Sequence, residues 1–92
     1  MTPGTNLSYH VHRHRMEIWT ILSGEGQLII DYQLRSVSAG DTIQIDRNIY
    51  HTIKASSDLE FIEVQMGEEV SEEDISRLYF DWNDILCLIK QN

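Results

Sequence analysis

The sequence predicts an all-β domain, a sandwich or a barrel, that ends in a helical tail. Seven short runs of strand-like composition follow one another between residues 8 and 66. Turn-forming stretches separate these runs, and none leaves room for the helical crossovers that an α/β sheet would need. The 92 residues suffice for one domain with one core, so we expect a single domain over 1–92.

The expected strands alternate with turns that are rich in glycine, aspartate, asparagine and serine. The turns are expected at 24–26, 39–41, 46–48 and 56–58. The strands are expected at 8–15, 17–24, 27–31, 34–38, 41–45, 50–56 and 59–66. Together they make a barrel over about residues 4–67.

A different pattern begins after Gly67 and predicts a helical tail over about residues 71–90, in one piece or broken. Ser71 is followed by three acidic residues, as in a capping box at the start of a helix. Apolar residues then recur with a period near 3.6, at Ile75, Leu78, Tyr79, Trp82, Leu86 and Ile89. The only cysteine, Cys87, has apolar neighbours, so we expect a buried, inert thiol.

The charge of the chain argues against two classes of partner. Fifteen acidic side chains stand against seven basic ones, for a net charge of −8, which would repel nucleic acid and an anionic membrane surface. No apolar run approaches the roughly 20 residues of a membrane span, and the first residues lack the pattern of a signal peptide. We therefore expect a cytoplasmic protein with neither partner.

Three of the four histidines, His10, His12 and His14, stand at alternate positions of the first expected strand. Alternate side chains of a strand share a face, whereas residues two and four apart are separated by about 6.6 and about 13 Å. One metal ion could therefore bind His10 with His12 or His12 with His14, and the spacing alone does not choose. Glu17 lies at an odd separation and joins this face only if a bend resets the alternation before it. The alternative without a metal is that all three histidines lie on a solvent-exposed face of the strand.

The spacing of these residues resembles the two sequence signatures of the cupin superfamily. Gly4, His10, His12, Glu17 and Gly24 match the whole first signature, and the stretch from Gly40 to His51 matches part of the second. The second signature departs from the family at Asp46, Asn48 and Ala55, where cupins usually have proline, glycine and asparagine. The resemblance implies a double-stranded β-helix, or jelly-roll barrel, with one divalent transition metal (Zn, Mn, Fe, Co or Ni) in its mouth. The implied ligands are His10, His12, Glu17 and His51.

A closer resemblance covers nearly the whole chain. The blocks "LSYHVHRHRMEIWTILSGEG", "DTIQIDRNIYHTI" and "LEFIEVQMGEEVSEEDISRL" look like the cupin domain at the C-terminal end of type II mannose-6-phosphate isomerases, which are often fused to mannose-1-phosphate guanylyltransferases. This chain has His10 where that family has glutamine. It has Tyr50 and Thr52 where the family often has lysine and arginine. We expect no sugar-nucleotide synthesis from these residues, since they include no guanylyltransferase domain.

This resemblance implies an isomerase that interconverts aldose and ketose phosphates through an enediol. The metal would polarise the carbonyl group, and His14 or Glu17 would act as the base. Arg15, Tyr50 and Arg77 would contact the substrate, with the arginines holding its phosphate. Two other functions remain open: a metal- or sugar-binding module without turnover, and an iron-dependent oxygenase of the dioxygenase type. A small sugar phosphate is the expected partner, and a homodimer is the expected assembly.

Overall fold

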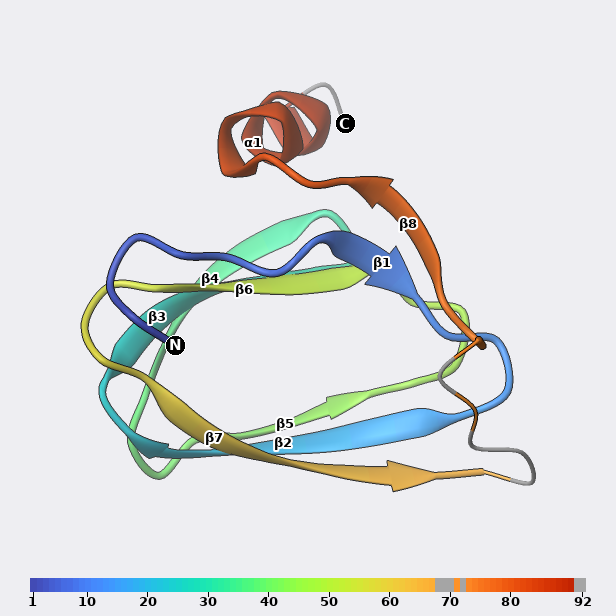
Figure 1. The fold of residues 1–92 in the computed structure, drawn as a ribbon, viewed down its shortest axis with the longest axis horizontal. Helices are drawn as coiled ribbons and strands as arrows, with labels where there is room; N and C mark the ends of the chain where they lie inside the picture. Colours follow the sequence, from blue (N-terminus) through green and yellow to red (C-terminus); the bar gives the residue numbers. More distant parts are fainter. Residues whose placement is uncertain (68–70, 72, 91–92) are drawn as a thin grey trace.

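Two antiparallel sheets face each other and a short helix covers the outside of one of them (Figure 1). This is a computed structural model, which describes residues 1–67, 71 and 73–90. Its elements are β1 (Tyr9–Val11), β2 (Met16–Ser23), β3 (Glu25–Ile30), β4 (Gln33–Ser38), β5 (Thr42–Ile45), β6 (His51–Ala55), β7 (Glu60–Met66), β8 (Ser76–Tyr79) and α1 (Trp82–Lys90).

The strand order is that of a rolled pair of sheets. Five strands form one sheet in the order β4-β3-β6-β1-β8, and three form the other in the order β5-β2-β7. Every pairing between neighbouring strands is antiparallel. The prediction of an all-β barrel with a C-terminal helix is confirmed, and β1 to β7 overlap the seven strands expected between residues 8 and 66.

Alternation along β2 builds the core between the two sheets. Glu17, Trp19 and Ile21 are buried, whereas the residues between them point outward and are half-exposed. Trp19 pairs with Ile43 on one side and with Glu63 on the other, so it lies at the middle of the three-stranded sheet. The apolar cluster around it consists of Trp19, Ile21, Leu28, Val37, Ile43, Ile45, Ile53, Ala55 and Leu59.

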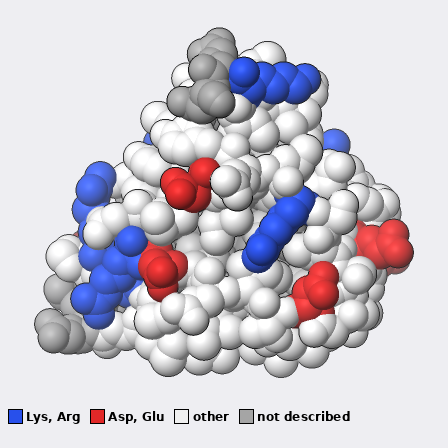
Figure 2. All heavy atoms as spheres, turned by 180° about the vertical axis from the view of Figure 1, so that it is seen from behind, with Lys and Arg blue, Asp and Glu red and all other residues white. Residues whose placement is uncertain are grey.

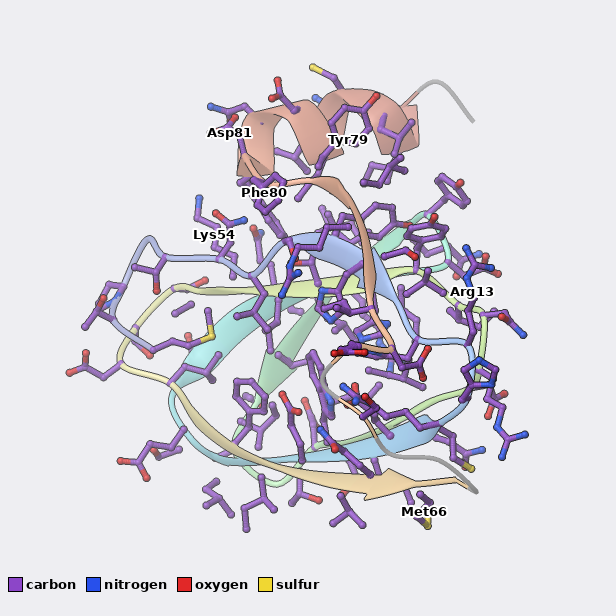
Figure 3. The ribbon with its side chains drawn as sticks, turned by 45° about the vertical axis from the view of Figure 1, so that its right-hand side comes forward. Arg13, Lys54, Met66, Tyr79, Phe80 and Asp81 are labelled. Atoms are coloured by element: carbon purple, nitrogen blue, oxygen red, sulfur yellow. The ribbon has the colours of Figure 1, made fainter. Side chains whose placement is uncertain are left out.

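A second apolar cluster joins the outer face of the five-stranded sheet to α1. Tyr9 and Ile29 from the sheet pack against Trp82 and Ile85 from the helix. The ammonium group of Lys54 lies 5.6 Å from the centre of the Trp82 ring, and Figure 3 shows Lys54 reaching toward the start of the helix. This packing anchors the C-terminal segment.

The C-terminal segment differs from the helical tail expected over residues 71–90. Residues Ser76–Tyr79 form β8, which pairs with β1, and the helix begins only at Trp82. Ser71 therefore caps a turn, where its hydroxyl accepts a hydrogen bond from the Glu73 N–H at 3.2 Å. Residues 76–79 pair with the edge of β1 although their apolar residues repeat with a helical period, because tertiary contacts outweigh local helix propensity.

The true cap of the helix is Asp81, whose carboxylate accepts hydrogen bonds from the N–H groups of Asn83 and Asp84 at 3.1 and 3.3 Å. The expectation of a buried Cys87 is wrong, since this side chain is exposed. It lies on the helix face opposite Ile85, which packs against the sheet together with Trp82.

Gly24 permits the turn that joins β2 to β3. Its φ angle is +86°, in the left-handed region that favours glycine, and a Cβ atom there would lie 1.9 Å from the carbonyl oxygen of Asp58. Any other residue would force these two loops apart.

The surface carries charges of both signs. On the face shown in Figure 2, acidic and basic side chains are scattered among uncharged ones. In the described part of the chain, no helix has both the length and the apolar character needed to cross a membrane.

Candidate metal centre

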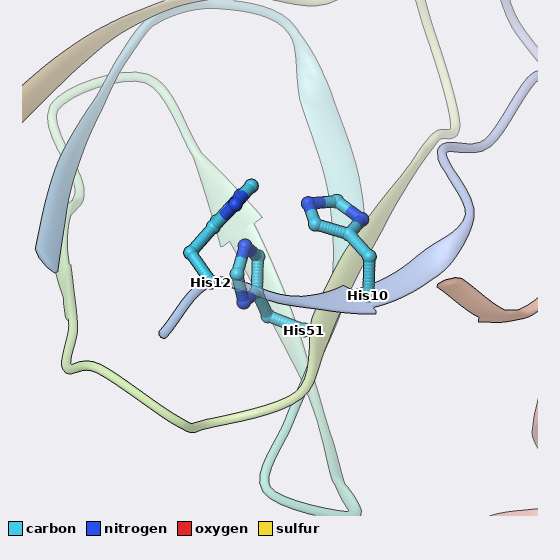
Figure 4. Close-up of side chains that lie close together, drawn as sticks. All are labelled: His10, His12 and His51. Carbon is cyan, nitrogen blue, oxygen red and sulfur yellow. The ribbon is translucent and has the colours of Figure 1, made fainter. Parts of the chain in front are cut away.

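Three histidines, from β1, from the turn after it and from β6, lie close together (Figure 4). His10 lies on β1 and pairs with His51 at the start of β6, and His12 follows the end of β1. One ring nitrogen from each of the three lies within 4.8 Å of the others. Their exposed fractions are only 6%, 4% and 0% for His10, His12 and His51. We call these three residues the histidine triad.

Backbone carbonyl groups fix the orientation of all three rings. The Nδ1 atoms of His10, His12 and His51 lie 2.6, 2.6 and 2.9 Å from the carbonyl oxygens of Ser8, Asp74 and Ile49. A carbonyl oxygen only accepts, so each Nδ1 carries the proton and each Nε2 offers its lone pair. Hydrogen bonds of this kind commonly orient histidines that bind metals.

Glu17 approaches the triad from the opposite sheet. Its Oε1 atom lies 3.4 Å from His51 Nε2 and 3.7 Å from His12 Nε2, and it accepts a hydrogen bond from the indole of Trp19 at 3.3 Å. A bend between β1 and β2 makes this possible, because it ends the alternation of β1 before Glu17. Such a bend is what the odd spacing of Glu17 required.

Arg15 is buried beside the triad. Its Nε atom lies 3.3 Å from Oε2 of Glu17, and its Nη2 atom lies 3.2 Å from Nε2 of His12. A third nitrogen, Nη1, donates to the carbonyl oxygen of Ser71 at 3.0 Å. The guanidinium group thus joins the two sheets to the segment that leads into β8.

The environment favours neutral imidazoles next to an ionised carboxylate. Burial, with a contribution from His51, lowers the pKa of His10 to about 4, and burial also lowers the pKa of His12. Burial alone would raise the pKa of Glu17, but its proximity to His51, His12 and the charged Arg15 outweighs burial and lowers that pKa. Neutral histidine and ionised glutamate are the forms that bind metals.

These residues fit a divalent transition metal. His51 Nε2 is buried and has no hydrogen-bond partner within the described residues, so its lone pair faces the centre without a donor. Three imidazole nitrogens and one carboxylate oxygen suit Zn, Mn, Fe, Co or Ni. The chemistry of the donor set therefore agrees with the implied metal, without selecting one ion.

Two residues expected at the site, His14 and Tyr50, lie elsewhere, and a third, Arg77, lies at its edge. His14 is exposed on the turn after β1, because the strand ends at Val11 and the alternation stops there. It lines an open groove of about 340 Å³ outside the triad. Tyr50 precedes His51 and so points to the opposite face of β6, where its ring packs 5.3 Å from that of Tyr9. Arg77 is exposed on β8, paired with His10.

The inner face of β7 carries two polar residues that were not assigned to the site from the sequence. Glu63 and Gln65 pair with Trp19 and Glu17, whose side chains point between the sheets. Opposite residues of an antiparallel pair share a face, and the ring of Phe61, on the same face, packs 5.0 Å from Trp19. Partial burial raises the pKa of Glu63, and the charge of Glu17 adds to the effect. Residues 61, 63 and 65 alternate along a strand that the sequence predicts, so the sequence could have placed Glu63 and Gln65 on the same face as Phe61.

Known structures share this architecture. A cupin protein from Bacteroides fragilis superimposes with a TM-score of 0.68 and 28% identity, over 80% of this chain and 68% of that one. A predicted oxalate decarboxylase from Thermotoga maritima gives a TM-score of 0.70 and 32% identity, over 73% of this chain and 60% of that one. The two facing sheets and the buried histidine triad define a cupin.

Sequence comparison narrows the class. The family model described as "Mannose-6-phosphate isomerase C-terminal" matches residues 1–80, and the chain belongs to this family. A mannose-1-phosphate guanylyltransferase from Salmonella muenchen is 35% identical over 78 residues, which cover 83% of this chain and 16% of that protein. The chain thus spans a small part of that relative, and the resemblance inferred from the sequence is confirmed.

Proposed function

We propose that this domain is a metal-dependent sugar-phosphate isomerase that interconverts mannose 6-phosphate and fructose 6-phosphate. The observation that carries the proposal is the convergence of three imidazole lone pairs and one carboxylate in a domain of the mannose-6-phosphate isomerase C-terminal family. The family supports a role related to sugar phosphates, and our proposal adds that the domain catalyses the isomerisation.

The reaction moves a proton between C1 and C2 and places negative charge on the carbonyl oxygen. A divalent metal held by the triad and Glu17 would supply the positive charge that stabilises this oxyanion. Backbone carbonyls hold the three rings in place, so the site needs little reorganisation when substrate binds. The neighbouring β7 face would contact the sugar.

The proton requires a group on the inner face, and we assign it to Glu63. His14 lies outside the barrel, and the carboxylate of Glu17 is already engaged by Arg15 and Trp19. Glu63 lies on the inner face of β7, where its side chain is exposed and therefore open to a substrate, and its raised pKa makes its carboxylate a better proton acceptor. Gln65, two residues further along the same face, offers an amide to the sugar hydroxyl groups.

Binding of the substrate's phosphate group requires a cationic side chain at the edge of the site. Arg77 is exposed on β8 and pairs with His10, and opposite residues of an antiparallel pair share a face of the sheet. A guanidinium group matches two phosphate oxygens at once. We therefore assign phosphate binding to Arg77, with Arg15 as the second cation beside the triad.

A coupled assay for fructose 6-phosphate, run on protein reloaded separately with Zn, Mn, Fe, Co or Ni, tests the proposal. Glu63→Gln should lower kcat by about 10²- to 10⁴-fold while metal content stays the same. Glu60→Gln is the matched control, because Glu60 lies on β7 with the outward parity and is exposed.

Failure of every metal-loaded form to turn over mannose 6-phosphate would contradict the proposal. Metal uptake without turnover would favour the binding module, and oxygen consumption by the iron form would favour the oxygenase.

A further inference from the structure

We infer that Asp74 is a positioning residue for the metal centre, because it fixes both the ring of His12 and the turn that carries it. The inference rests on the proposed metal site. Asp74 lies just before β8, and its place relative to His12 is set by the pairing of β8 with β1. A residue 62 positions away thus orients one of the three ligands.

Both ends of Asp74 hold the segment around His12. Its backbone carbonyl oxygen accepts the hydrogen bond from Nδ1 of His12 at 2.6 Å. Its carboxylate accepts hydrogen bonds from the backbone N–H groups of Arg13 and His14, to Oδ1 at 3.0 Å and to Oδ2 at 2.9 Å. Three consecutive residues, 12 to 14, therefore depend on this one aspartate.

The other two ligands do not need such a partner. The carbonyl groups that orient His10 and His51 belong to Ser8 and Ile49, each only two residues away along the chain. His12 lies beyond the last residue of β1, where the strand no longer restrains it. The N–H of Asn48 holds the His12 carbonyl oxygen at 2.8 Å but does not contact the ring. Nη2 of Arg15 lies 3.2 Å from Nε2 of the ring, and Arg15 is itself held by Ser71, in the segment that leads to Asp74.

The same segment also holds Arg15, through the carbonyl oxygen of Ser71. Figure 3 shows Arg13 on the outside of the molecule, so the backbone of this turn, rather than the arginine side chain, makes the contact with Asp74. Loss of the Asp74 carboxylate would release the turn and with it the carbonyl that orients His12. Metal affinity should then fall although all the ligands remain.

Cobalt binding by Asp74→Ala and Asp74→Asn, followed by calorimetry and visible absorption, tests the inference. We expect Asp74→Ala to weaken Co²⁺ binding by about 10- to 100-fold, as other partners of metal-bound histidines do, and Asp74→Asn to weaken it less because one acceptor oxygen remains. Asp81→Ala is the matched control, since it also removes two N–H···carboxylate bonds but at the start of α1. Its Co²⁺ affinity should stay within about twofold of the parent protein.

A second readout needs no metal. In the chelator-treated parent protein, ¹⁵N shifts of the His12 side chain should report a proton on Nδ1. In Asp74→Ala and Asp74→Asn they should report a mixture of tautomers, as expected when the carbonyl no longer holds the ring.

Unchanged Co²⁺ affinity with an unchanged His12 tautomer would overturn the inference, and so would equal losses of affinity in Asp74→Ala and Asp81→Ala. A parent protein that binds no Co²⁺ would refute the proposed function, whereas the tautomer of His12 would still decide the role of Asp74. If Asp74→Ala does not fold, Asp74→Asn supplies both measurements.

Discussion

The ion pair between Arg15 and Glu17 makes a quantitative prediction about stability. Both side chains are buried, with exposed fractions of 9% and 2%, and Arg15 Nε lies 3.3 Å from Glu17 Oε2. Glu17→Gln leaves the guanidinium group buried without its carboxylate, and Arg15→Met leaves the carboxylate without its cation. Removal of one partner from a buried pair costs about 3–5 kcal/mol.

The double variant should be far more stable than the sum of the two losses implies. With both charges gone, no uncompensated charge stays buried, so we expect a coupling free energy of at least about 2 kcal/mol. A domain of this length has a free energy of unfolding of roughly 5–14 kcal/mol. Each single variant therefore stays folded when the parent's free energy of unfolding exceeds about 5 kcal/mol.

Urea unfolding of the metal-free protein at pH 7.5, followed by circular dichroism, measures all four members of the cycle. Equal m-values are required for the comparison. Arg13→Met is the control, since this exposed arginine lies in the same turn and its replacement should cost less than about 0.5 kcal/mol. Single losses below about 1 kcal/mol, or losses that add within about 0.5 kcal/mol, would refute the reasoning.

Three further predictions concern His10, Gly67 and Cys87. Burial lowers the pKa of His10 to about 4, so the unfolded chain binds more protons below pH 6.5, and His10 alone should make the metal-free protein lose up to about 2 kcal/mol between pH 7 and pH 5; His10→Gln should reduce the slope in urea titrations by that amount and leave the smaller part that comes from His12. Gly67→Ala would place a Cβ atom 2.3 Å from the carbonyl oxygen of His14, so we expect a loss of about 1–3 kcal/mol in urea, and unchanged stability would contradict the close packing. Cys87 is exposed, so Ellman's reagent should modify it at the same rate in native and urea-unfolded protein, and protection in the native state would contradict its placement.

Local patterns explain why most of the barrel could be predicted. Alternation from Glu17 to Ile21 marks which side chains of β2 face the core, and Gly24 marks the turn that follows. These signals depend only on neighbouring residues. The strand β8 has no such signal, because its pairing with β1 depends on a partner more than 60 residues away, whereas its apolar residues fit a helical period.

The candidate site was predictable in part for the same reason. The resemblance to cupins identified the triad and Glu17, which the fold brings together. His14 was expected on the same strand face as His10 and His12. The strand ends at Val11 and the chain bends there, so His14 lies on the exposed turn instead. Asp74 contacts His12 from 62 residues away in the chain, so no local sequence pattern around His12 could predict this contact.

The metal content of the purified protein tests the histidine triad most directly. Elemental analysis after equilibration with Co²⁺ and removal of the unbound ion should find one cobalt per chain in the parent protein. His14→Ala, which removes an exposed histidine two residues from His12, should keep that cobalt, whereas His51→Ala should lose it. Cobalt retained in His51→Ala, or none bound by the parent, would contradict a metal centre between the two sheets.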